Sequence, residues 1–472
     1  MELKGKKGDF DYAQSPKHLP ENLRNPNGAD RCLSGVDRCL SGVEGSGYKQ
    51  TEIGVIPEDW EIKNLDEIGQ VLVGLTYSPE QVREFGTLVL RSSNIQSNSL
   101  AFENNVFVDM QLPERVIVKK DDILICVRNG SRSLIGKCAL ITKSVEGSAF
   151  GAFMAIYRTK NSKYVFSAFQ SNIIQKQIEN NLGATINQIT NKDLKSFLIP
   201  LPPLPEQQKI AEALSDTDAL IQSLKKLIAK KKDIKQGAMQ ELLSGKRRLE
   251  GFDGEWENVK LGSIATFLKG KSLSKSQLIV NGKHKCIHYG ELFTFYKETI
   301  TEIKSRTDLP ITENTFLSQN NDILMPTSDV TPNGLATASC INEEKVIIGG
   351  DVLVIRAHKQ KLNGTFFSYI VSISKEKIMQ LVSGSTVYHL YGSDMAKFEF
   401  NFPVEISEQT RIAQILTDMD AEIEALEKQL QKTELLKQGM MQELLTGRIR
   451  LVKPQAEMPA MVAEPTQNYK TH

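Results

Sequence analysis

Hydrophobic side chains recur at heptad spacing in two long stretches of the chain. The positions are Ile210, Leu214, Thr217, Ile221, Leu224 and Ile228 in the first stretch, and Ile412, Leu416, Met419, Ile423, Leu426 and Leu430 in the second. Steps of four and three residues alternate, which is the spacing of a coiled-coil seam rather than of a broad globular face. The pattern predicts two helices of about 40 residues, each about 60 Å long.

Terminal signals support both helices. Pro205 suits the first turn of the first helix, and Ser407 is a suitable N-cap for the second. Gly245 and Gly447 stand where each helix is expected to stop. The Lys and Arg residues that follow them suit the negative end of a helix dipole. We therefore expect the helices within residues 204–249 and 405–452.

The two helices are copies of one another. Glu206–Leu249 aligns with Glu408–Leu451 at a constant shift of 202 without gaps, and 23 of the 44 positions are identical. The first copy carries ten Lys and Arg against six Asp and Glu, whereas the second carries six against eight. A shared seam and opposite net charge favour an antiparallel intramolecular pair. The alternative is two solvated helices whose charges have no such meaning.

The segments before the helices repeat as well, more faintly. "DWEIKNLDEIGQVLVGLT" in the first half matches "EWENVKLGSIATFLKGKS" in the second, with Trp60 aligned to Trp256. "DDILI" at Asp121 likewise matches "NDILM" at Asn321. The order along the chain is therefore globular unit, long helix, globular unit, long helix.

Each globular unit is expected to have an α+β fold. "TLVLRSSNI", "RVIVKKDDILICVRNGS" and "GAFMAIYRT" are rich in β-branched residues and are separated by turns, which is typical of strands. "KYVFSAFQSNIIQKQIENNL", residues 163–182, has the spacing of one helix. We predict two tandem α+β domains, residues 50–203 and 250–404, separated by two long helices that form an antiparallel coiled coil, with a pseudo-twofold internal repeat.

The two ends of the chain differ from the rest in composition. Residues 1–49 contain the tandem repeat "DRCLSGVDRCLSGV" among Gly, Asn and Pro residues. This composition predicts a poorly ordered N-terminal extension, and residues 453–472 are expected to form a flexible tail.

The overall composition is that of an ordinary globular protein, with 40% hydrophobic and 24% charged residues in 472. No apolar run approaches the roughly 20 residues of a membrane span, and the first residues do not resemble a signal peptide, so the cytoplasm is the expected compartment. Six scattered cysteines without a C-x-x-C pair predict free thiols. A net charge of +1 means that any DNA contact needs local positive charge.

Motifs for catalysis or cofactor binding are weak or missing. "ATFLKGKS" at Ala265–Ser272 fits a loose phosphate-loop pattern, but the matching segment of the first unit has Leu75 in place of the lysine. "HKCIH" puts His284, Cys286 and His288 on one face of a strand without an evident fourth zinc ligand. A G-x-G-x-x-G fingerprint, an Asn-Pro-Pro-aromatic tetrad and a spaced nuclease motif are not found. We therefore expect no metal and no cofactor.

At this point the motifs resemble those of a known family. "PLPPLPEQQKIAEAL", "MQELLSGKRRL" and "GFDGEWENVKLG" look like the specificity subunit of type I restriction–modification systems. "GVIPEDWEIKNLDEIG" and "DDILICVRNGSRSLIGKCAL" look like the opening and the middle of its first target-recognition domain. The resemblance covers roughly Tyr48–Leu451. The chain departs from the pattern in its N-terminal extension and in "FPVEISEQT" at the start of the second helix.

The resemblance implies a function in DNA recognition. Each globular unit would be a target-recognition domain that reads one half of a bipartite, asymmetric site in double-stranded DNA. The two helices would set the distance between the halves and dock two adenine methyltransferase subunits. ATP-dependent restriction subunits would join them in the full complex, and the specificity subunit itself would do no chemistry.

Side chains able to read base edges stand on loops at matching places of both units. The candidates in the first unit are Arg91, Ser92, Ser93, Asn94, Arg128, Asn129, Ser131, Arg132, Thr185, Asn187 and Gln188. Those in the second unit are His288, Tyr289, Thr327, Ser328, Thr331, Asn333, Thr386, Tyr388 and His389, with Lys269 and Lys271 as phosphate contacts. Matching places with different chemistry are expected when one scaffold reads two sequences, although an ordinary surface loop is the alternative for each residue.

The most similar parts of the two helices are the candidate docking surfaces for partner subunits. They comprise Gln236, Gly237, Met239, Gln240, Glu241, Leu242 and Leu243 in the first helix, and Gln438, Gly439, Met441, Gln442, Glu443, Leu444 and Leu445 in the second. A glycine inside a helix costs roughly 1 kcal/mol relative to alanine, which suggests close approach of another backbone. The alternative is that these residues pack against their own domains.

Two functions of other classes stay open. One is a scaffold that binds proteins rather than DNA through two modules on a coiled coil, which the low net charge permits. The other is an enzyme, as a fused nuclease or methyltransferase. A steep salt dependence of DNA affinity would argue against the first, and a methyl-transfer assay on the isolated chain would test the second.

Overall fold

The computed structural model describes residues 47–182, 187–271, 273–358 and 361–452. They divide into two compact units, which are described separately. Unit 1 contains residues 47–219 together with 435–452, and unit 2 contains residues 220–434. The tandem seven-residue repeat and the predicted tail lie outside the described residues. Among the described residues, no helix is long and apolar enough to cross a membrane.

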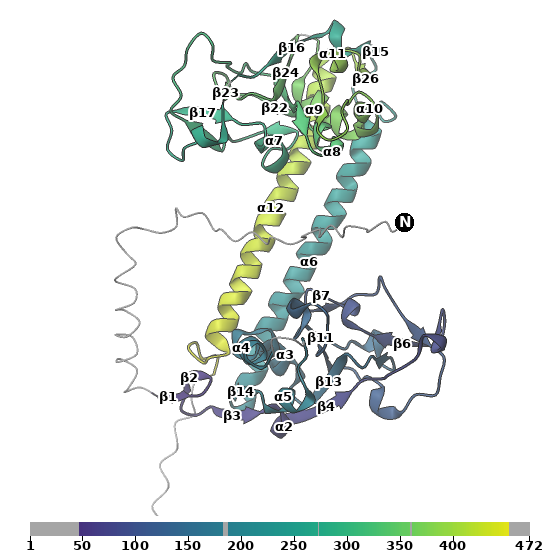
Figure 1. Cartoon of the computed structure of the whole chain (residues 1–472), viewed down its shortest axis with the longest axis vertical. Coiled ribbons are helices and arrows are strands. Elements are labelled where there is room, and N and C mark those ends of the chain that lie inside the picture. The colour runs from purple at the N-terminus through teal and green to yellow at the C-terminus, as the bar shows by residue number, and fades with distance from the viewer. Residues whose placement is uncertain (1–46, 183–186, 272, 359–360, 453–472) are drawn as a thin grey trace, which may run out of the picture. The chain divides into compact units, whose positions relative to one another are not determined.

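Two long helices dominate the secondary structure, as the heptad pattern predicted. Helix α6 spans Leu204–Leu242 and α12 spans Ile406–Leu444, with 39 residues in each (Figure 1). Pro205 lies in the first turn of α6, as expected. The prediction for Ser407 is wrong, because α12 begins at Ile406 and Ser407 lies inside the helix, where its hydroxyl donates to the Glu405 carboxylate.

Each helix stops three residues before the glycine that the sequence indicated, and the glycine lies in the turn that follows. Gly245 and Gly447 have φ angles of +71° and +70°, in the left-handed region that favours glycine. The main-chain N–H of Gly245 donates to Leu242, and that of Gly447 donates to Leu444. Both helices therefore end in the same tight turn.

The helices run antiparallel within each unit, which confirms the predicted pair. In unit 1 the start of α6, through Ile210 and Leu214, shares a core with Leu444 and Leu445 at the end of α12. In unit 2 the start of α12, with Ile412 and Leu416, shares a core with the end of α6. All of these side chains are buried.

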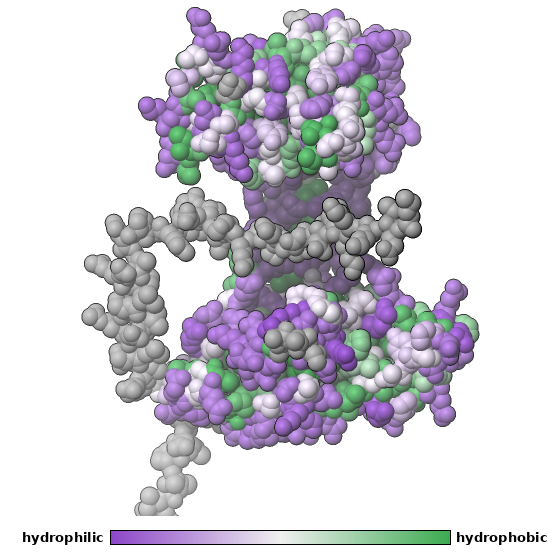
Figure 2. All heavy atoms as spheres, in the orientation of Figure 1, coloured by the Kyte–Doolittle hydropathy of each residue, from purple (hydrophilic) through white to green (hydrophobic). Residues whose placement is uncertain are grey.

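Ion pairs between the helices confirm the predicted attraction. They are Lys225–Glu434, Lys231–Glu422, Lys232–Glu427 and Lys235–Asp420 in unit 2, at 2.6–2.9 Å, and Lys437–Asp218 in unit 1, at 2.6 Å. The lysine of every unit 2 pair comes from α6 and the carboxylate from α12. Exposed pairs contribute only about 0–1 kcal/mol each, so the main effect of the exposed ones is to favour this orientation and register. The Lys235–Asp420 pair is less accessible, since its side chains are only 13% and 19% exposed. Figure 2 shows mostly hydrophilic residues on the visible faces of both helices.

Unit 1 contains a globular α+β domain before α6. Its elements are β1 (Tyr48–Thr51), β2 (Gly54–Pro57), β3 (Glu61–Asn64), α2 (Leu65–Ile68), β4 (Gly69–Val73), β5 (Val82–Arg83), β6 (Thr87–Leu90), β7 (Ile95–Gln96), β8 (Ser99–Leu100), β9 (Phe107–Val108), β10 (Ile123–Cys126), β11 (Cys138–Leu140), β12 (Ala149–Phe150), β13 (Met154–Thr159), α3 (Ser162–Gln170), α4 (Asn172–Asn181), α5 (Asn191–Ser196) and β14 (Leu198–Leu201). The antiparallel sheet β11-β10-β13-β4 forms its centre, and β12-β6-β9-β5 forms a second sheet.

Unit 2 contains the second α+β domain. Its elements are β15 (Trp256–Lys260), β16 (Ala265–Lys269), β17 (His284–Ile287), α7 (Glu291–Thr294), β18 (Thr299–Ile300), β19 (Ser305–Thr307), β20 (Asp322–Pro326), β21 (Ser328–Asp329), α8 (Pro332–Leu335), β22 (Ser339–Ile341), β23 (Ile347–Ile348), β24 (Val352–Ala357), α9 (Gly364–Ile373), α10 (Lys375–Met379), β25 (Tyr388–His389), α11 (Gly392–Met395) and β26 (Glu399–Pro403). The sheet β16-β24-β20-β22-β18 forms its centre.

The two domains share one topology, as the repeat predicted. Strands β4, β13 and β10 pair in unit 1 in the way that β16, β24 and β20 pair in unit 2. A buried aspartate at the start of the central strand binds an arginine on the neighbouring strand through two hydrogen bonds in both units, Asp122 with Arg158 and Asp322 with Arg356. The α+β fold and the internal repeat are therefore confirmed.

One predicted element is broken in two. The single helix expected over residues 163–182 is α3 followed by α4, with Ser171 between them in an extended conformation. The Ser171 hydroxyl accepts a hydrogen bond from the N–H of Ile173 and caps α4. Serine competes well for this role at a helix start, which explains why an apolar spacing of one helix gives two.

Candidate nucleic-acid interface

Three of the loops predicted to read DNA meet at one edge of the domain in unit 1. The Asn129 amide donates to the Ser92 hydroxyl at 3.1 Å, and the Asn187 amide donates to the main-chain oxygen of Gly130 at 2.9 Å. Arg128 and Gln188 lie opposite each other in an isolated β-bridge. The chain therefore brings together residues that are up to 96 positions apart in sequence.

This cluster carries unneutralised positive charge. Within the described part of the chain, Arg91, Arg128 and Arg132 have no carboxylate within ion-pair distance. Arg132 donates to the main-chain oxygen of Glu179, and the Nε of Arg91 is buried without a hydrogen-bond partner among the described residues. By contrast, the two hydrogen bonds to Asp122 raise the pKa of Arg158 in the same domain. The local charge that DNA binding requires is thus present despite a net charge of +1.

Three other candidates of this domain differ in their surroundings. Asn94 is fully buried, and its amide bonds to Arg91, Ala101 and Asn105, so its side chain supports the loop instead of facing a ligand. Ser131 is exposed on the surface beside Asn129. Thr185 lies outside the described residues.

In unit 2 the matching loops are joined by a short strand pair. Strand β21 pairs with β25, which sets Ser328 opposite His389, and the Ser328 hydroxyl lies 3.2 Å from Nδ1 of His389. The pair borders a cavity of about 450 Å³ that Lys269, Asp351 and Tyr391 also line. Lys269 pairs with Asp351 at 3.4 Å. The buried hydroxyl of Thr327 borders the same cavity without a hydrogen-bond partner among the described residues.

The remaining candidates of unit 2 surround this pair or precede α7. Tyr388 pairs with Asp329 in the β21–β25 ladder, and the Thr331 hydroxyl donates to the Asp329 carboxylate at 2.8 Å. Lys271, Thr331, Asn333 and Thr386 are exposed. His288 and Tyr289 are half-buried next to α7, with their rings 4.6 Å apart. Buried Glu291 accepts a hydrogen bond from the His288 main chain.

Backbone hydrogen bonds establish which positions of the two units correspond. The N–H of Ile189 donates to Val127 in unit 1, and the N–H of Leu390 donates to Thr327 in unit 2. Arg128 therefore occupies the place of Ser328, and Gln188 occupies the place of His389. The two units present different hydrogen-bonding groups from the same backbone positions.

The candidate docking residues on the helices fall into two groups. Gln236, Gly237 and Gln240 on α6 are exposed, as are Gln438, Gly439 and Gln442 on α12. The six apolar candidates are buried in the cores of their own units, which removes them from the candidate surface; they are Met239, Leu242, Leu243, Met441, Leu444 and Leu445. Their neighbours Glu241 and Glu443 bind Arg247 and Arg448 nearby. A Cβ atom added at Gly237 or Gly439 would meet nothing within 4 Å.

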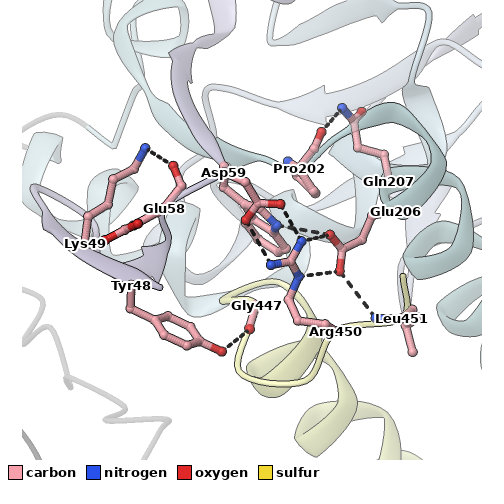
Figure 3. A network of polar contacts seen from close by, with 11 residues as sticks. Tyr48, Lys49, Glu58, Asp59, Pro202, Glu206, Gln207, Gly447, Arg450 and Leu451 are labelled. Atoms are coloured by element: carbon pink, nitrogen blue, oxygen red, sulfur yellow. Dashed lines mark hydrogen bonds and ion pairs between the residues drawn. The ribbon is translucent and has the colours of Figure 1, made fainter. Parts of the chain in front are cut away.

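A buried ion-pair network that the sequence reading missed joins the helix ends in unit 1 (Figure 3). Glu206, which is 1% exposed, accepts two hydrogen bonds from Arg450 at 2.7 and 2.8 Å. Trp60 donates its indole N–H to the same carboxylate at 3.1 Å, and Arg450 also binds Asp59. These contacts raise the pKa of Arg450, with the hydrogen bonds to Glu206 as the largest cause. We call this network the clamp of unit 1.

Unit 2 has a simpler clamp of the same design. Buried Glu408 accepts two hydrogen bonds from Arg248, both at 2.8 Å, and Arg248 lies over the ring of Trp256. The indole N–H of Trp256 is buried without a partner among the described residues. The missed signal was in the repeat, because Glu206 matches Glu408 and Arg248 matches Arg450 at the same shift of 202.

The described residues offer no metal site. They contain no group of three His, Cys, Asp or Glu residues that could hold a metal ion. Cys286 of the "HKCIH" segment is buried, and burial raises the pKa of its thiol to about 12, which opposes the thiolate form that zinc binds.

Comparisons with known proteins point to one family. The model of the type I restriction modification DNA specificity domain matches residues 57–232 and again 253–435, well over half of the chain. The protein named as the MjaX type I restriction enzyme specificity subunit of Methanocaldococcus jannaschii is 28% identical over 433 residues, which cover 86% of this chain and 97% of that protein. The EcoKI specificity subunit of Escherichia coli K12 is 31% identical over 203 residues, 41% of this chain and 43% of that protein.

A solved structure supports the fold. The crystal structure of the S subunit of a type I restriction-modification system from M. genitalium superposes with a TM-score of 0.57 at 17% sequence identity, and the match covers 82% of this chain and 96% of that one. The duplicated family domain, carried on the same duplicated fold, identifies the family. The chain belongs to the family of type I restriction–modification DNA specificity domains.

Proposed function

We propose that the two units read the two different halves of one asymmetric, two-part DNA sequence within a type I restriction–modification complex. As a member of this family, the chain is a DNA-recognition subunit and not an enzyme. The observation that carries the proposal is the correspondence of Arg128 and Gln188 with Ser328 and His389. One scaffold that presents different groups at the same positions suits two different half-sites.

The proposed division of the chain follows the repeat. Residues 50–203 and 250–404 are the two reading domains, and residues 204–249 and 405–452 are the spacers. The loop residues that contact base edges are those around Ser92, Arg128 and Gln188 in unit 1, and those around Ser328 and His389 in unit 2. Lys269 and Lys271 contact phosphate.

The exposed helix residues are the proposed docking surface for two adenine methyltransferase subunits. Gln236, Gly237 and Gln240 recur as Gln438, Gly439 and Gln442, and two identical partners need two similar surfaces. Both glycines are exposed inside helices with open space around them, which leaves room for a partner's backbone. ATP-dependent restriction subunits complete the complex, and work on cellular DNA agrees with the cytoplasm as its compartment.

Mapping of methylated adenines tests the proposal. DNA is sequenced from cells that express this chain with its methyltransferase partner, and from cells that express the partner alone. A new methylated motif made of two dissimilar half-sites around a fixed gap is expected. A palindromic or continuous motif, or no new methylation, would contradict the proposal. A flat salt dependence of binding to DNA would favour the protein-binding scaffold instead.

A further inference from the structure

We propose that Phe153 holds Arg128 in place to read a guanine, so that unit 1 requires a G·C pair at one position of its half-site. This inference rests on the proposed function and assigns a base and a positioning residue to it. Phe153 was not among the residues that the sequence suggested. At the corresponding positions among the described residues of unit 2 there is no such pair, so the proposed requirement concerns the half-site that unit 1 reads.

The geometry of the pair is the first observation. The guanidinium of Arg128 lies over the ring of Phe153, 5.1 Å from its centroid. Both side chains are exposed, and Phe153 shows 56% of its surface. The main-chain N–H groups of Val127 and Arg128 both donate to the carbonyl of Phe153 at 3.1 Å. The two residues are thus fixed to each other by the backbone as well as by the ring contact.

The lack of a carboxylate partner is the second observation. Arg158 and Arg356 bind buried aspartates and belong to the frame of their sheets. In the described part of the chain, Arg128 has no such carboxylate partner for its guanidinium. A large exposed ring and an unpaired guanidinium do little for the fold, so a ligand accounts for them better than packing does.

The chemistry of the pair favours guanine. A guanidinium donates two parallel N–H groups, and O6 and N7 of guanine accept them in the major groove. A ring beneath the guanidinium restricts its rotation and keeps its plane fixed, which lowers the conformational entropy lost when the base binds. A phosphate contact needs no such fixed plane. Gln188 lies beside Arg128 through the β-bridge and can add contacts to the neighbouring base.

Unit 2 has different groups at the corresponding positions. The N–H of Thr327 donates to Asp351, as that of Val127 donates to Phe153, so Asp351 takes the place of the ring. Ser328 takes the place of the arginine, and Asp351 pairs with Lys269. A hydroxyl accepts and donates without strong preference among bases. The arginine-and-ring arrangement therefore belongs to unit 1 alone among these corresponding positions.

The test uses the complex of the full chain with its methyltransferase partner and duplexes that carry the mapped site. Each guanine of the half-site read by unit 1 is replaced singly by 7-deazaguanine, which lacks the N7 acceptor. With the unaltered protein, one replacement is expected to weaken binding measurably, but by less than the roughly 5- to 150-fold of a whole bidentate base contact, because the O6 acceptor remains. With Arg128→Ala this loss disappears. With Phe153→Ala the loss of binding caused by 7-deazaguanine becomes smaller, and with Phe153→Tyr it is unchanged.

Controls separate this role from folding and from phosphate binding. Ser328→Ala, the matched change in unit 2, alters binding through the other half-site, and the relative loss caused by the 7-deazaguanine replacement stays the same. An unchanged effect in Phe153→Ala would overturn the role of the ring. A half-site without a sensitive guanine, or an Arg128→Ala variant that binds all sequences equally more weakly with a salt slope reduced by about one, would overturn the guanine assignment. An unaltered complex that does not prefer its mapped site would instead contradict the proposed function.

Discussion

At the scale of single residues, the two clamps show how a repeated pair acquires unequal surroundings. Glu206 and Glu408 are both buried, and each is held by an arginine that follows the other long helix. Arg450 also binds Asp59, whereas Arg248 has no second carboxylate at hydrogen-bond distance among the described residues. Burial of one charge is compensated only by its partner, so the loss of that partner is costly.

We expect Glu408→Gln to destabilise unit 2 by about 1–3 kcal/mol, because Arg248, whose side chain is 29% exposed, loses its charged hydrogen-bond partner. Glu206→Gln is expected to cost less, because Arg450 keeps Asp59. Urea unfolding of the full chain measures both changes. Equal losses would show that the Asp59 contact has no compensating effect.

The four described cysteines predict a loss of stability at alkaline pH. Burial raises the pKa of Cys126 to about 11 and that of Cys138, Cys286 and Cys340 to about 12. Below the ordinary value of 9.0 the thiols are protonated in the folded and unfolded states alike. Above it, the unfolded chain releases protons that the folded chain keeps, so the free energy of unfolding falls as pH rises from about 9 towards 12.

Alkylation and unfolding check this prediction. At pH 8 the native protein is expected to protect the peptides that contain these four cysteines from iodoacetamide, and urea is expected to expose them. Urea midpoints are expected to fall between pH 9 and 11. Rapid native labelling of Cys138 would contradict both expectations.

The residues of the candidate interface were only partly predictable from sequence. The internal sequence repeat placed Arg128 and Ser328 at corresponding positions, and the backbone hydrogen bonds of the structure agree. Asn94 and Asn129 look alike in sequence, since both are amides in polar loops, yet Asn94 is fully buried. The folded conformation of a loop decides which amide side chain it uses for its own hydrogen bonds. The local sequence pattern does not contain this information. Phe153 was missed because an aromatic residue is expected in the core when only the sequence is known, whereas this one is exposed.

At the scale of elements, heptad spacing and terminal glycines were enough to predict both long helices. The break at Ser171 was not predicted, because the apolar spacing continues across it and only the cap contact reveals it. The apolar docking candidates proved to be core residues, and the reason that the sequence did not show this is related. Met239 and Leu242 lie on the face that packs inward, and similarity between the copies does not distinguish a shared core from a shared partner.

The helix glycines give the clearest prediction at this scale. Gly237→Ala and Gly439→Ala are each expected to stabilise the isolated chain by about 1 kcal/mol, because both lie in helix interiors with open space around them. If a partner backbone approaches there, the same changes lower the affinity for the methyltransferase subunit. Urea unfolding and titration of the partner measure the two effects.

Gly447→Ala is the matched control for these variants. Its φ of +70° and the Pro57 side chain, which would lie 2.4 Å from the new Cβ atom, predict destabilisation. Unchanged affinity for the partner in both Gly237→Ala and Gly439→Ala would remove these glycines from the docking surface.

At the scale of the whole molecule, the long helices connect two reading domains of one fold. Helix α6 begins in unit 1 and ends in unit 2. Its length can therefore be changed by insertion without altering either reading domain. A seven-residue insertion adds about 10 Å of helix and preserves the heptad phase. Insertions after Lys226 in α6 and after Gln429 in α12 would lengthen both helices in register.

We expect this double insertion to lengthen the gap of the recognised site by about three base pairs and to leave both half-sites unchanged. Mapping of methylated adenines gives the result. Insertion into α6 alone is the control, and it is expected to abolish methylation because the ion pairs and the seam lose their register. A changed half-site in the double insertion would mean that the helices do more than space the domains.

The composition of unit 1 has a consequence for how the protein is made. Its core includes Leu444 and Leu445, and its clamp includes Arg450, although the rest of the unit ends at residue 219. A ribosome that adds roughly 5–20 residues per second needs more than ten seconds to reach these residues after it has made Glu206. During this interval the nascent first domain lacks its last layer, and Glu206 has no arginine. The first domain to be translated is therefore the last to be completed.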